Sequence, residues 1–236
     1  MKHHLLVLVF LLNSIISFSQ TYDEYIEKGN AKLKAKDYAG AIVDYDKAIA
    51  IHAQFSPPYY YLSLAKYRLE DYKGALENLN TAVLLKDFDP DYFFKRAQVK
   101  TELADYPGAK ADYSKVIELS PNNELSYYFR GYINEKLDDK KSALADYDKY
   151  IEMAPADPDG WEIRGKLKYK LEDYQGAIID FNKAIELAPT KGAIYNDRGT
   201  CYYGLKNYDQ ACADFKKAVE LGETGAAKRN VEGFCK

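Results

Sequence analysis

Apolar residues are spaced three and four positions apart over several stretches of the chain. One such stretch begins at Tyr174 and ends at Leu187, and another, from Trp161 to Leu171, comes just before it. This spacing places the apolar side chains on one face of an α-helix. The polar pair Glu172-Asp173 separates the two stretches, so the pattern predicts two helices joined by a short turn. The apolar face of the second predicted helix consists of Tyr174, Ala177, Ile178, Phe181, Ala184 and Ile185.

This helix pair recurs every 34 residues without insertion, and the polar residue at the turn shows the period most clearly. A fixed period of this length indicates units that stack only on their neighbours, which is a solenoid. We therefore expect an all-α fold. The turn residue is Asp37, Asp71, Asp105, Asp139, Asp173 and finally Asn207. The six expected units are residues 22–55, 56–89, 90–123, 124–157, 158–191 and 192–225.

The last residues, 226–236, continue the period for half a unit. The end of a solenoid exposes an apolar face, which a helix with a polar outer side covers. We expect residues 226–236 to form such a capping helix.

The first residues differ from the repeats. Residues 1–19 contain one early cation, Lys2, and an apolar run from Leu5 to Phe18, and they end with small residues at Ser17 and Ser19. This pattern is typical of a secretory signal peptide cleaved after Ser19. A membrane anchor is the alternative, but the run is shorter than the roughly 20 residues that span a bilayer. We expect an exported protein, periplasmic or secreted, with no membrane span after cleavage.

Charge and histidine content narrow the classes of function. Lys plus Arg number 33 and Asp plus Glu number 36, so the chain lacks the basic excess typical of nucleic-acid binding. Two of the three histidines, His3 and His4, lie in the predicted leader. A pair of imidazoles, as catalytic groups or metal ligands, is therefore not expected. We predict no catalytic residue, no metal site and no cofactor.

Small and aromatic residues occupy fixed columns of the repeat. Glycine inside a helix costs about 1 kcal/mol relative to alanine, so its recurrence at Gly131, Gly165 and Gly199 predicts a close approach of helix backbones. The aromatic columns are predicted to form the core. They are Tyr25, Tyr59, Phe93, Tyr127, Trp161 and Tyr195, and Tyr38, Tyr72, Tyr106, Tyr174 and Tyr208.

An aromatic residue, a glycine four positions later, then Tyr, Ala, Phe or Tyr, Ala and a closing Pro recur along the chain, as from Trp161 to Pro189. This series resembles the tetratricopeptide repeat, and Arg-Gly pairs such as Arg164-Gly165 resemble a bacterial variety of it. The resemblance implies antiparallel helix pairs in a right-handed superhelix with a concave groove. It points to an exported bacterial member of the family.

Two charged columns change together. The first is Lys28, Leu62, Arg96, Arg130, Arg164 and Arg198. The second lies 16 residues further on and is Asp44, Asn78, Asp112, Asp146, Asp180 and Asp214. Because Leu62 accompanies Asn78, we predict an ion pair between the two helices of each unit, with solvent-facing, unpaired charges as the alternative. Exposed pairs contribute about 0–1 kcal/mol, so we expect them to fix register more than stability.

Three cysteines follow the predicted leader. An exported protein can oxidise its thiols. Cys212 lies on the last second helix, against which the capping helix should pack, so a Cys212–Cys235 disulfide is our preferred prediction. A Cys201–Cys212 bridge and three free thiols remain open.

In the family that the repeat resembles, the groove is lined by the inward faces of the first helices. That resemblance implies a partner-binding surface on which a protein or peptide docks, although some of its members could instead pack between helices. Tyrosine and phenylalanine make interface anchors with a low ordering cost. The implied residues are Tyr60, Leu64, Tyr67, Phe94, Gln98, Tyr128, Tyr132, Lys166, Tyr169 and Tyr203. The carboxylate clamp of chaperone-binding members is not supported, because only Asn30 matches it.

We therefore expect a non-catalytic scaffold or adaptor that binds a protein or peptide in the bacterial cell envelope. A self-assembling structural module, and with it a homo-oligomer, is the alternative. An enzyme is disfavoured because no nucleophile–base pair, metal spacing or phosphate loop is present. The sequence does not identify the partner.

Overall fold

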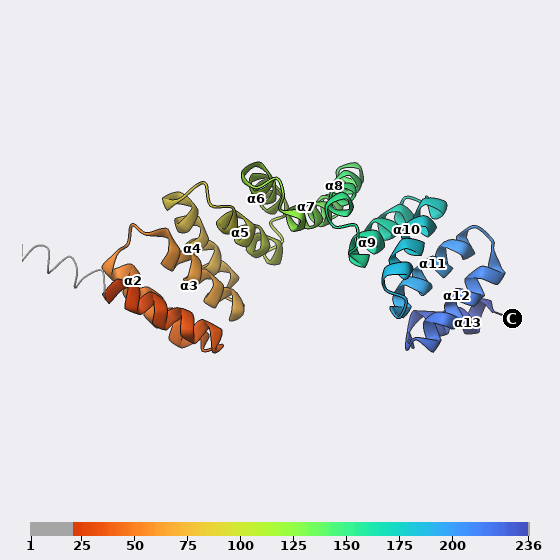
Figure 1. The fold of residues 1–236 in the computed structure, drawn as a ribbon, viewed down its shortest axis with the longest axis horizontal. Helices are drawn as coiled ribbons and strands as arrows, with labels where there is room; N and C mark the ends of the chain where they lie inside the picture. The colour runs from red at the N-terminus through yellow and green to blue at the C-terminus, as the bar shows by residue number, and fades with distance from the viewer. Residues whose placement is uncertain (1–20, 236) are drawn as a thin grey trace, which may run out of the picture. The chain divides into compact units, whose positions relative to one another are not determined.

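The structure is a computed structural model that describes residues 21–235, and the predicted signal peptide, residues 1–19, lies outside them. The described residues are helical throughout, with short turns and no strand (Figure 1). None of their helices has the length and apolar character that a membrane crossing requires. The chain divides into two compact units, an N-terminal unit that ends at Pro121 and a C-terminal unit that begins at Asn122.

Each unit is built from helix pairs. The N-terminal unit contains a helix at residues 21–34, followed by α2 (Tyr38–Ile51), α3 (Ser56–Arg68), α4 (Tyr72–Leu85), α5 (Pro90–Glu102) and α6 (Tyr106–Leu119). The C-terminal unit contains α7 (Glu124–Lys136), α8 (Lys140–Met153), α9 (Pro158–Lys170), α10 (Tyr174–Leu187), α11 (Gly192–Gly204), α12 (Tyr208–Glu220) and α13 (Ala226–Phe234).

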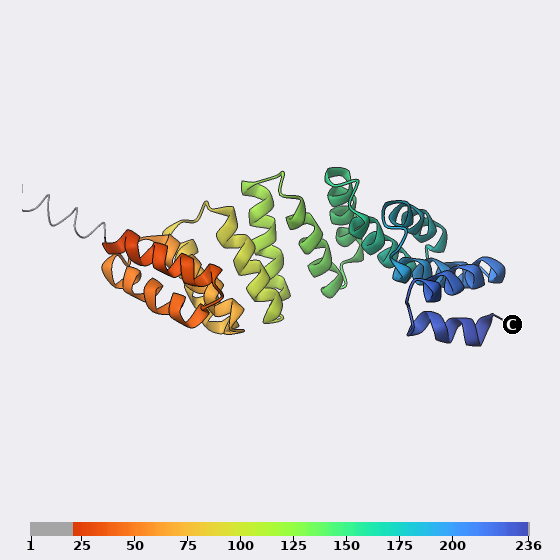
Figure 2. The same cartoon turned by 60° about the horizontal axis from the view of Figure 1, so that its bottom comes forward.

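Consecutive helices pack on one another within each unit (Figure 2). In the N-terminal unit α3 packs on α4 and α5 on α6, and the pairs meet through α2 with α3 and α4 with α5. In the C-terminal unit α7 packs on α8, α9 on α10 and α11 on α12, and α8 meets α9 as α10 meets α11. This stacking of neighbouring helix pairs within each unit confirms the predicted all-α solenoid class.

The turn inside each pair explains the recurrent aspartate. At the turn between α9 and α10, Glu172 adopts a left-handed conformation with φ of 62°. The next backbone N–H, of Asp173, donates to the carbonyl of Lys168 at 3.0 Å, which closes α9. The Asp173 side chain then accepts from the backbone N–H of Gly176 at 2.9 Å and caps α10. The same residue therefore ends one turn and begins the next helix.

The aromatic core differs from the predicted columns. The fully buried large side chains on the second helices are Tyr45, Leu79, Tyr113, Tyr147, Phe181 and Phe215. The predicted column that includes Trp161 is mostly half-buried, and Tyr208 in the other column is 51% exposed. The reason is visible at Trp161, where the Arg164 guanidinium lies 5.1 Å from the ring centroid and covers it from one side. That column lies under a cation rather than inside the core.

The glycine column makes room for the buried rings. A Cβ atom added to Gly131 would lie 2.6 Å from Cε1 of Tyr147, and one added to Gly165 would lie 2.9 Å from Cε1 of Phe181. Both distances are shorter than carbon atoms tolerate. The close approach predicted at these glycines is thus between a first helix and an aromatic side chain of its partner helix, not between two backbones.

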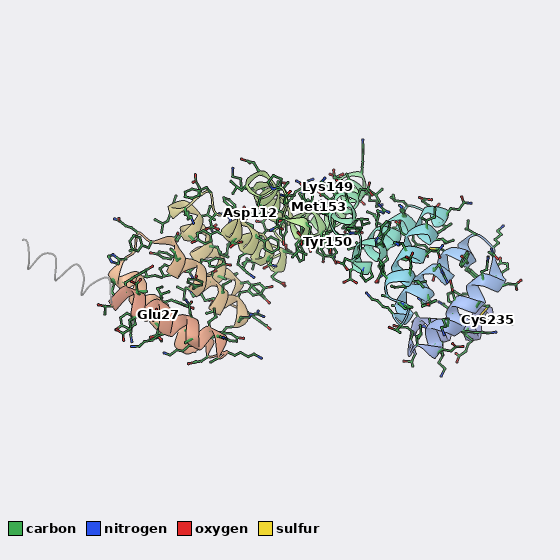
Figure 3. All side chains as sticks on the ribbon, in the orientation of Figure 1. Glu27, Asp112, Lys149, Tyr150, Met153 and Cys235 are labelled. Atoms are coloured by element: carbon green, nitrogen blue, oxygen red, sulfur yellow. A yellow bond between two sulfur atoms is a disulfide. The ribbon has the colours of Figure 1, made fainter. Side chains whose placement is uncertain are left out.

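The charged columns meet between the two helices of a unit. Nη2 of Arg164 lies 2.7 Å from Oδ1 of Asp180, and Nε of the same guanidinium donates to Oδ2 at 2.9 Å. The separations from Nη2 to Oδ1 are 2.7 Å for Arg96 with Asp112 (labelled in Figure 3), 2.6 Å for Arg130 with Asp146 and 2.6 Å for Arg198 with Asp214. All four pairs are bidentate, which is the strongest geometry for this interaction.

The carboxylates of these pairs are buried, which alters the expected energetics. Asp180 is 0% exposed, so the low value for exposed pairs does not apply. A second cation, Lys168, also reaches Asp180 at 2.8 Å, and Asn134 takes this place at Asp146. Removing one partner of a buried pair leaves an uncompensated charge.

The first 34-residue repeat, residues 22–55, departs from the predicted pairing of the charged columns. Asp44 is contacted by Lys32, whose Nζ lies 2.6 Å from Oδ2, while Lys28 lies 2.7 Å from Glu24 on its own helix. The acidic column thus takes its cation four residues later, at the position that Lys168 occupies in its unit.

The capping helix covers the end of the C-terminal unit. Helix α13 packs against α12, and Phe234 lies 4.3 Å from the Tyr203 ring, between centroids. Cys212 on α12 is paired with Cys235, at the end of α13, with Cα atoms 5.4 Å apart (Figure 3). Cys201 is buried and free.

We predict that Asp180→Ala destabilises the protein by about 3–5 kcal/mol, because Arg164 and Lys168 then lose their buried counter-charge. Urea unfolding measures the change. Glu186→Ala is the control, since it also removes one carboxylate, but from an exposed ion pair with Lys183. Its free energy of unfolding should stay within about 0.5 kcal/mol of wild type. Equal losses in both variants would refute a structural role for the buried pair.

We predict that non-reducing peptide mapping recovers a peptide pair linked through Cys212 and Cys235, with Cys201 as a free thiol. Because the two cysteines are 23 residues apart, reduction should lower the free energy of unfolding by about 3 kcal/mol. A Cys212→Ser/Cys235→Ser variant should match the reduced wild type. Recovery of a Cys201–Cys212 peptide, or of three free thiols, would contradict the pairing.

Candidate functional site

The N-terminal unit has a cleft of about 560 Å³, which we call the N-terminal cleft. The first helices form most of its walls, together with the turn before α2 and the first residue of α2, so residues far apart in the sequence meet there. Three of the predicted partner-binding residues, Tyr60, Leu64 and Tyr67, are among its lining residues. The full set is Leu33, Lys34, Lys36, Tyr38, Tyr60, Leu64, Tyr67, Arg68 and Lys95.

The tyrosines of the N-terminal cleft are held by neighbours on α5. The Tyr60 ring lies 5.0 Å from that of Tyr92, between centroids, and burial, with a smaller effect of Asp91, raises the pKa of Tyr60 to about 12. The Tyr67 hydroxyl donates to Glu102 at 3.1 Å. Both phenols therefore stay neutral and present a fixed aromatic surface to the cleft.

Four cationic side chains surround the same space. Lys95 is the most enclosed of them, and burial, together with the charge of Arg68, lowers its pKa. Its Nζ donates to Gln98 at 2.5 Å and lies 4.8 Å from the centroid of the Tyr67 ring. Gln98 therefore orients Lys95 instead of lining the cleft itself.

The C-terminal unit has two smaller clefts on its first helices, which share Ile163 and Lys166. One, of about 240 Å³, is lined by Tyr128, Asp159, Glu162, Ile163, Lys166 and Lys191. The other, of about 320 Å³, is lined by Tyr132, Glu135, Lys136, Ile163, Lys166 and Lys170. We call these two the C-terminal clefts.

Ion pairs link the charges of the C-terminal clefts. Lys166 pairs with Glu162. Lys191 lies 2.7 Å from the other Glu162 oxygen, and Lys170 lies 2.7 Å from Glu135. Burial lowers the pKa of Lys166, but the hydrogen bond that Lys166 donates to Glu162 and the nearby charge of Asp197 outweigh burial, so the pKa is raised. These clefts present neutralised charge pairs.

The remaining predicted partner-binding residues pack against other side chains. The Phe94 ring meets Tyr113 edge-on, with centroids 5.5 Å apart, and Tyr169 lies 5.6 Å from Tyr174. Tyr203 lies under Phe234 of the capping helix. None of these three residues lines a cleft described above. Their packing corresponds to the alternative stated for the predicted binding surface, that some of its residues pack between helices.

Sequence reasoning did not select Lys34, Lys36, Arg68 and Lys95. The first three lie at the ends of first helices or in the turn that follows, outside the inward face that the family resemblance implied. A signal was present, because Lys34 and Arg68 are one period apart and therefore had to project from the same place on adjacent units. In the described part of the chain, no group of His, Cys, Asp and Glu is arranged to hold a metal ion.

Comparison with solved structures places the fold among known solenoids. Pseudomonas aeruginosa PilF matches with a TM-score of 0.73 and 15% identity over 92% of this chain and 98% of its own. A tetratricopeptide repeat protein from Parabacteroides merdae matches with a TM-score of 0.71 and 19% identity over 92% of this chain and 100% of its own. YrrB, a repeat protein with an unusual peptide-binding site, matches with 0.69 and 19% over 80% of this chain and 97% of its own.

The sequence itself matches models of one family. Two tetratricopeptide repeat models match, one over residues 158–191 and 192–224 and the other over residues 94–158. Together the matches cover more than half of the chain. No curated protein matches the sequence. With its repeated helix pairs and its fold in agreement, the chain belongs to the tetratricopeptide repeat family.

Proposed function

We propose that this protein is a non-catalytic scaffold that binds a segment of a partner protein in the clefts of its first helices. The observation that carries the proposal is the division of labour within the repeat. Second helices supply the buried rings and carboxylates that recur from unit to unit, whereas first helices line clefts whose residues differ between the units.

The clefts have the size and chemistry of binding sites for side chains. The N-terminal cleft falls within the range of about 300–1,000 Å³ typical of ligand sites. Tyr60 places a rigid ring in the N-terminal cleft and Tyr128 places one in a C-terminal cleft, and such rings provide contact area at a low entropic cost. The peptide-binding site of YrrB, a protein of similar fold, supports a peptide as the bound species.

We also propose that the protein acts outside the cytoplasm, in the periplasm or beyond it. The support is the signal-peptide pattern of residues 1–19 and the juxtaposition of Cys212 and Cys235, which an oxidising compartment would join.

We predict that a Tyr60→Ala/Tyr128→Ala variant recovers partners at least about tenfold less well than wild type in a crosslinking pull-down from envelope extract, because aromatic anchors dominate interface energies. Tyr59→Ala/Tyr127→Ala is a matched control, with the same substitutions one residue earlier on the same helices, outside the clefts. Circular dichroism checks that both variants fold. Equal recovery by the two variants would reject the clefts as the binding surface.

We predict that the mature protein begins at Gln20 and fractionates with periplasmic or culture-medium markers. Fractionation followed by N-terminal sequencing measures both. Replacing Leu8 and Leu11 with Lys should block export, because the apolar run of a signal peptide then loses its continuity. A chain that keeps Met1 and sediments with membranes would contradict the proposal.

A further inference from the structure

The N-terminal cleft carries an unusual charge. Among the described residues, four cations line it and no carboxylate does, although the Tyr67 hydroxyl of its wall donates to Glu102. Within residues 21–235, none of these four cations lies in an ion pair, whereas the buried carboxylates of the same unit, Asp44 and Asp112, are each paired with a cation. The four residues are Lys34, Lys36, Arg68 and Lys95.

The C-terminal clefts show that this excess of positive charge belongs to the N-terminal cleft and is not shared by the other clefts on the first helices. There, Lys166, Lys170 and Lys191 each meet at least one carboxylate within 2.9 Å or less. The chain as a whole has a net charge of −3. A local group of cations without carboxylate partners in an acidic protein therefore favours an anionic ligand. Such a ligand supplies the counter-charge that the protein itself lacks at this cleft, and it gains electrostatic binding energy.

Lys95 indicates where the counter-charge should bind. Its ammonium group is half-buried, and burial and Arg68 together lower its pKa. Its ammonium group donates to the neutral amide oxygen of Gln98. An ammonium that is partly desolvated and lacks an anion is in an unfavourable state, which a carboxylate between Lys95 and Arg68 would relieve. Arg68 offers a planar fork suited to bidentate carboxylate binding.

The other walls of the cleft define the rest of the ligand. Leu33 and Leu64 provide apolar surface, and Tyr38 and Tyr60 provide rings. A ligand with carboxylates alone would leave this surface unused, whereas a peptide segment can present an apolar side chain between two acidic ones. A concave site of this size excludes the flat surface of a bilayer, and the acidic balance of the chain opposes long polyanions such as nucleic acids.

We propose that the N-terminal cleft binds an acidic segment of a partner protein, with aspartate or glutamate carboxylates at Arg68 and Lys95 and an apolar side chain against Leu33 and Leu64. This inference rests on the proposed scaffold function and specifies the partner chemistry of one of its sites.

Fluorescence anisotropy tests the proposal with a labelled peptide of alternating glutamate and leucine, and with the same peptide in which glutamine replaces glutamate. The glutamate peptide should bind at least about tenfold more tightly than the glutamine peptide, and its affinity should fall as salt screens the charges. Equal binding of the two peptides would overturn the proposal.

Arg68→Gln/Lys95→Gln should weaken binding of the glutamate peptide by about tenfold or more, while keeping side-chain length and polarity. Lys47→Ala/Lys73→Ala is the control, because it removes the same net charge from exposed positions on α2 and α4, outside the cleft. It should change the affinity by less than about twofold. Equal weakening by both double variants would show a diffuse charge effect and would overturn the proposal.

Two further probes cover other anions. A single-stranded oligothymidylate or a phosphatidylglycerol vesicle that binds more tightly than the peptide, and is lost in Arg68→Gln/Lys95→Gln, would overturn the assignment to an acidic peptide. The pull-down with Tyr60→Ala/Tyr128→Ala separates the two levels of the argument. If partner recovery depends on those tyrosines while the glutamate peptide ignores the cations, the scaffold function stands and the acidic specificity falls.

Discussion

The buried aspartate that all but one of the second helices carry is the constraint on which the stacking depends. A carboxylate such as Asp180 cannot remain charged inside the helix pair without cations, so Arg164 and Lys168 of the partner helix must reach it. The guanidinium that does so has a donor left over, and Nη1 of Arg164 lies 2.7 Å from Asp148 on the preceding second helix. One buried charge thus fixes the pairing within a unit and the register between neighbours.

The second 34-residue repeat, residues 56–89, shows what the ion pair adds to the packing of a helix pair. There Leu62 and Asn78 replace the charged partners; Leu62 is buried with Tyr45 and Ala41, and Asn78 donates to its own helix at Gly74. The helices still pair, which agrees with the general finding that apolar replacements of a buried ion pair fold well. Stability alone therefore does not explain the other charged columns. Register does, because an apolar contact tolerates sliding, whereas a bidentate pair has one geometry.

Much of this fold could be predicted from the sequence because the fold follows from two regular spacings, the 34-residue repeat and the helical spacing of apolar residues. The 34-residue interval and the apolar spacing from Tyr174 to Leu187 gave the helix pairs, and α10 has those bounds. Covariation of Leu62 with Asn78 indicated contact within a unit. Depth could not be predicted, because a column position does not tell how far a side chain lies below its neighbours. The columns therefore predict an exposed Asp180 and a Trp161 inside the core, whereas Asp180 is buried and Trp161 is half-buried.

The candidate site was harder to predict for a related reason. Its residues come from helix ends and turns, where side-chain direction depends on the local backbone, as at Lys36 with its positive φ of 62°. Tyr60 and Tyr128 follow from the inward face of first helices, but the cations at Lys34 and Arg68 lie beyond that face. A pattern of faces predicts the middle of a helix better than its ends.

The repeat also explains how one framework can carry opposite charges at the same position. Lys95 in the N-terminal unit and Asp197 in the C-terminal unit occupy one column, three periods apart. Burial acts on both, lowering the pKa of Lys95 and raising that of Asp197. Oδ2 of Asp197 lies 3.4 Å from Nζ of Lys166, whereas Lys95 lies among other cations and no carboxylate of the described residues forms an ion pair with it. Since the second helices keep the fold, that column is free to change sign between the two units.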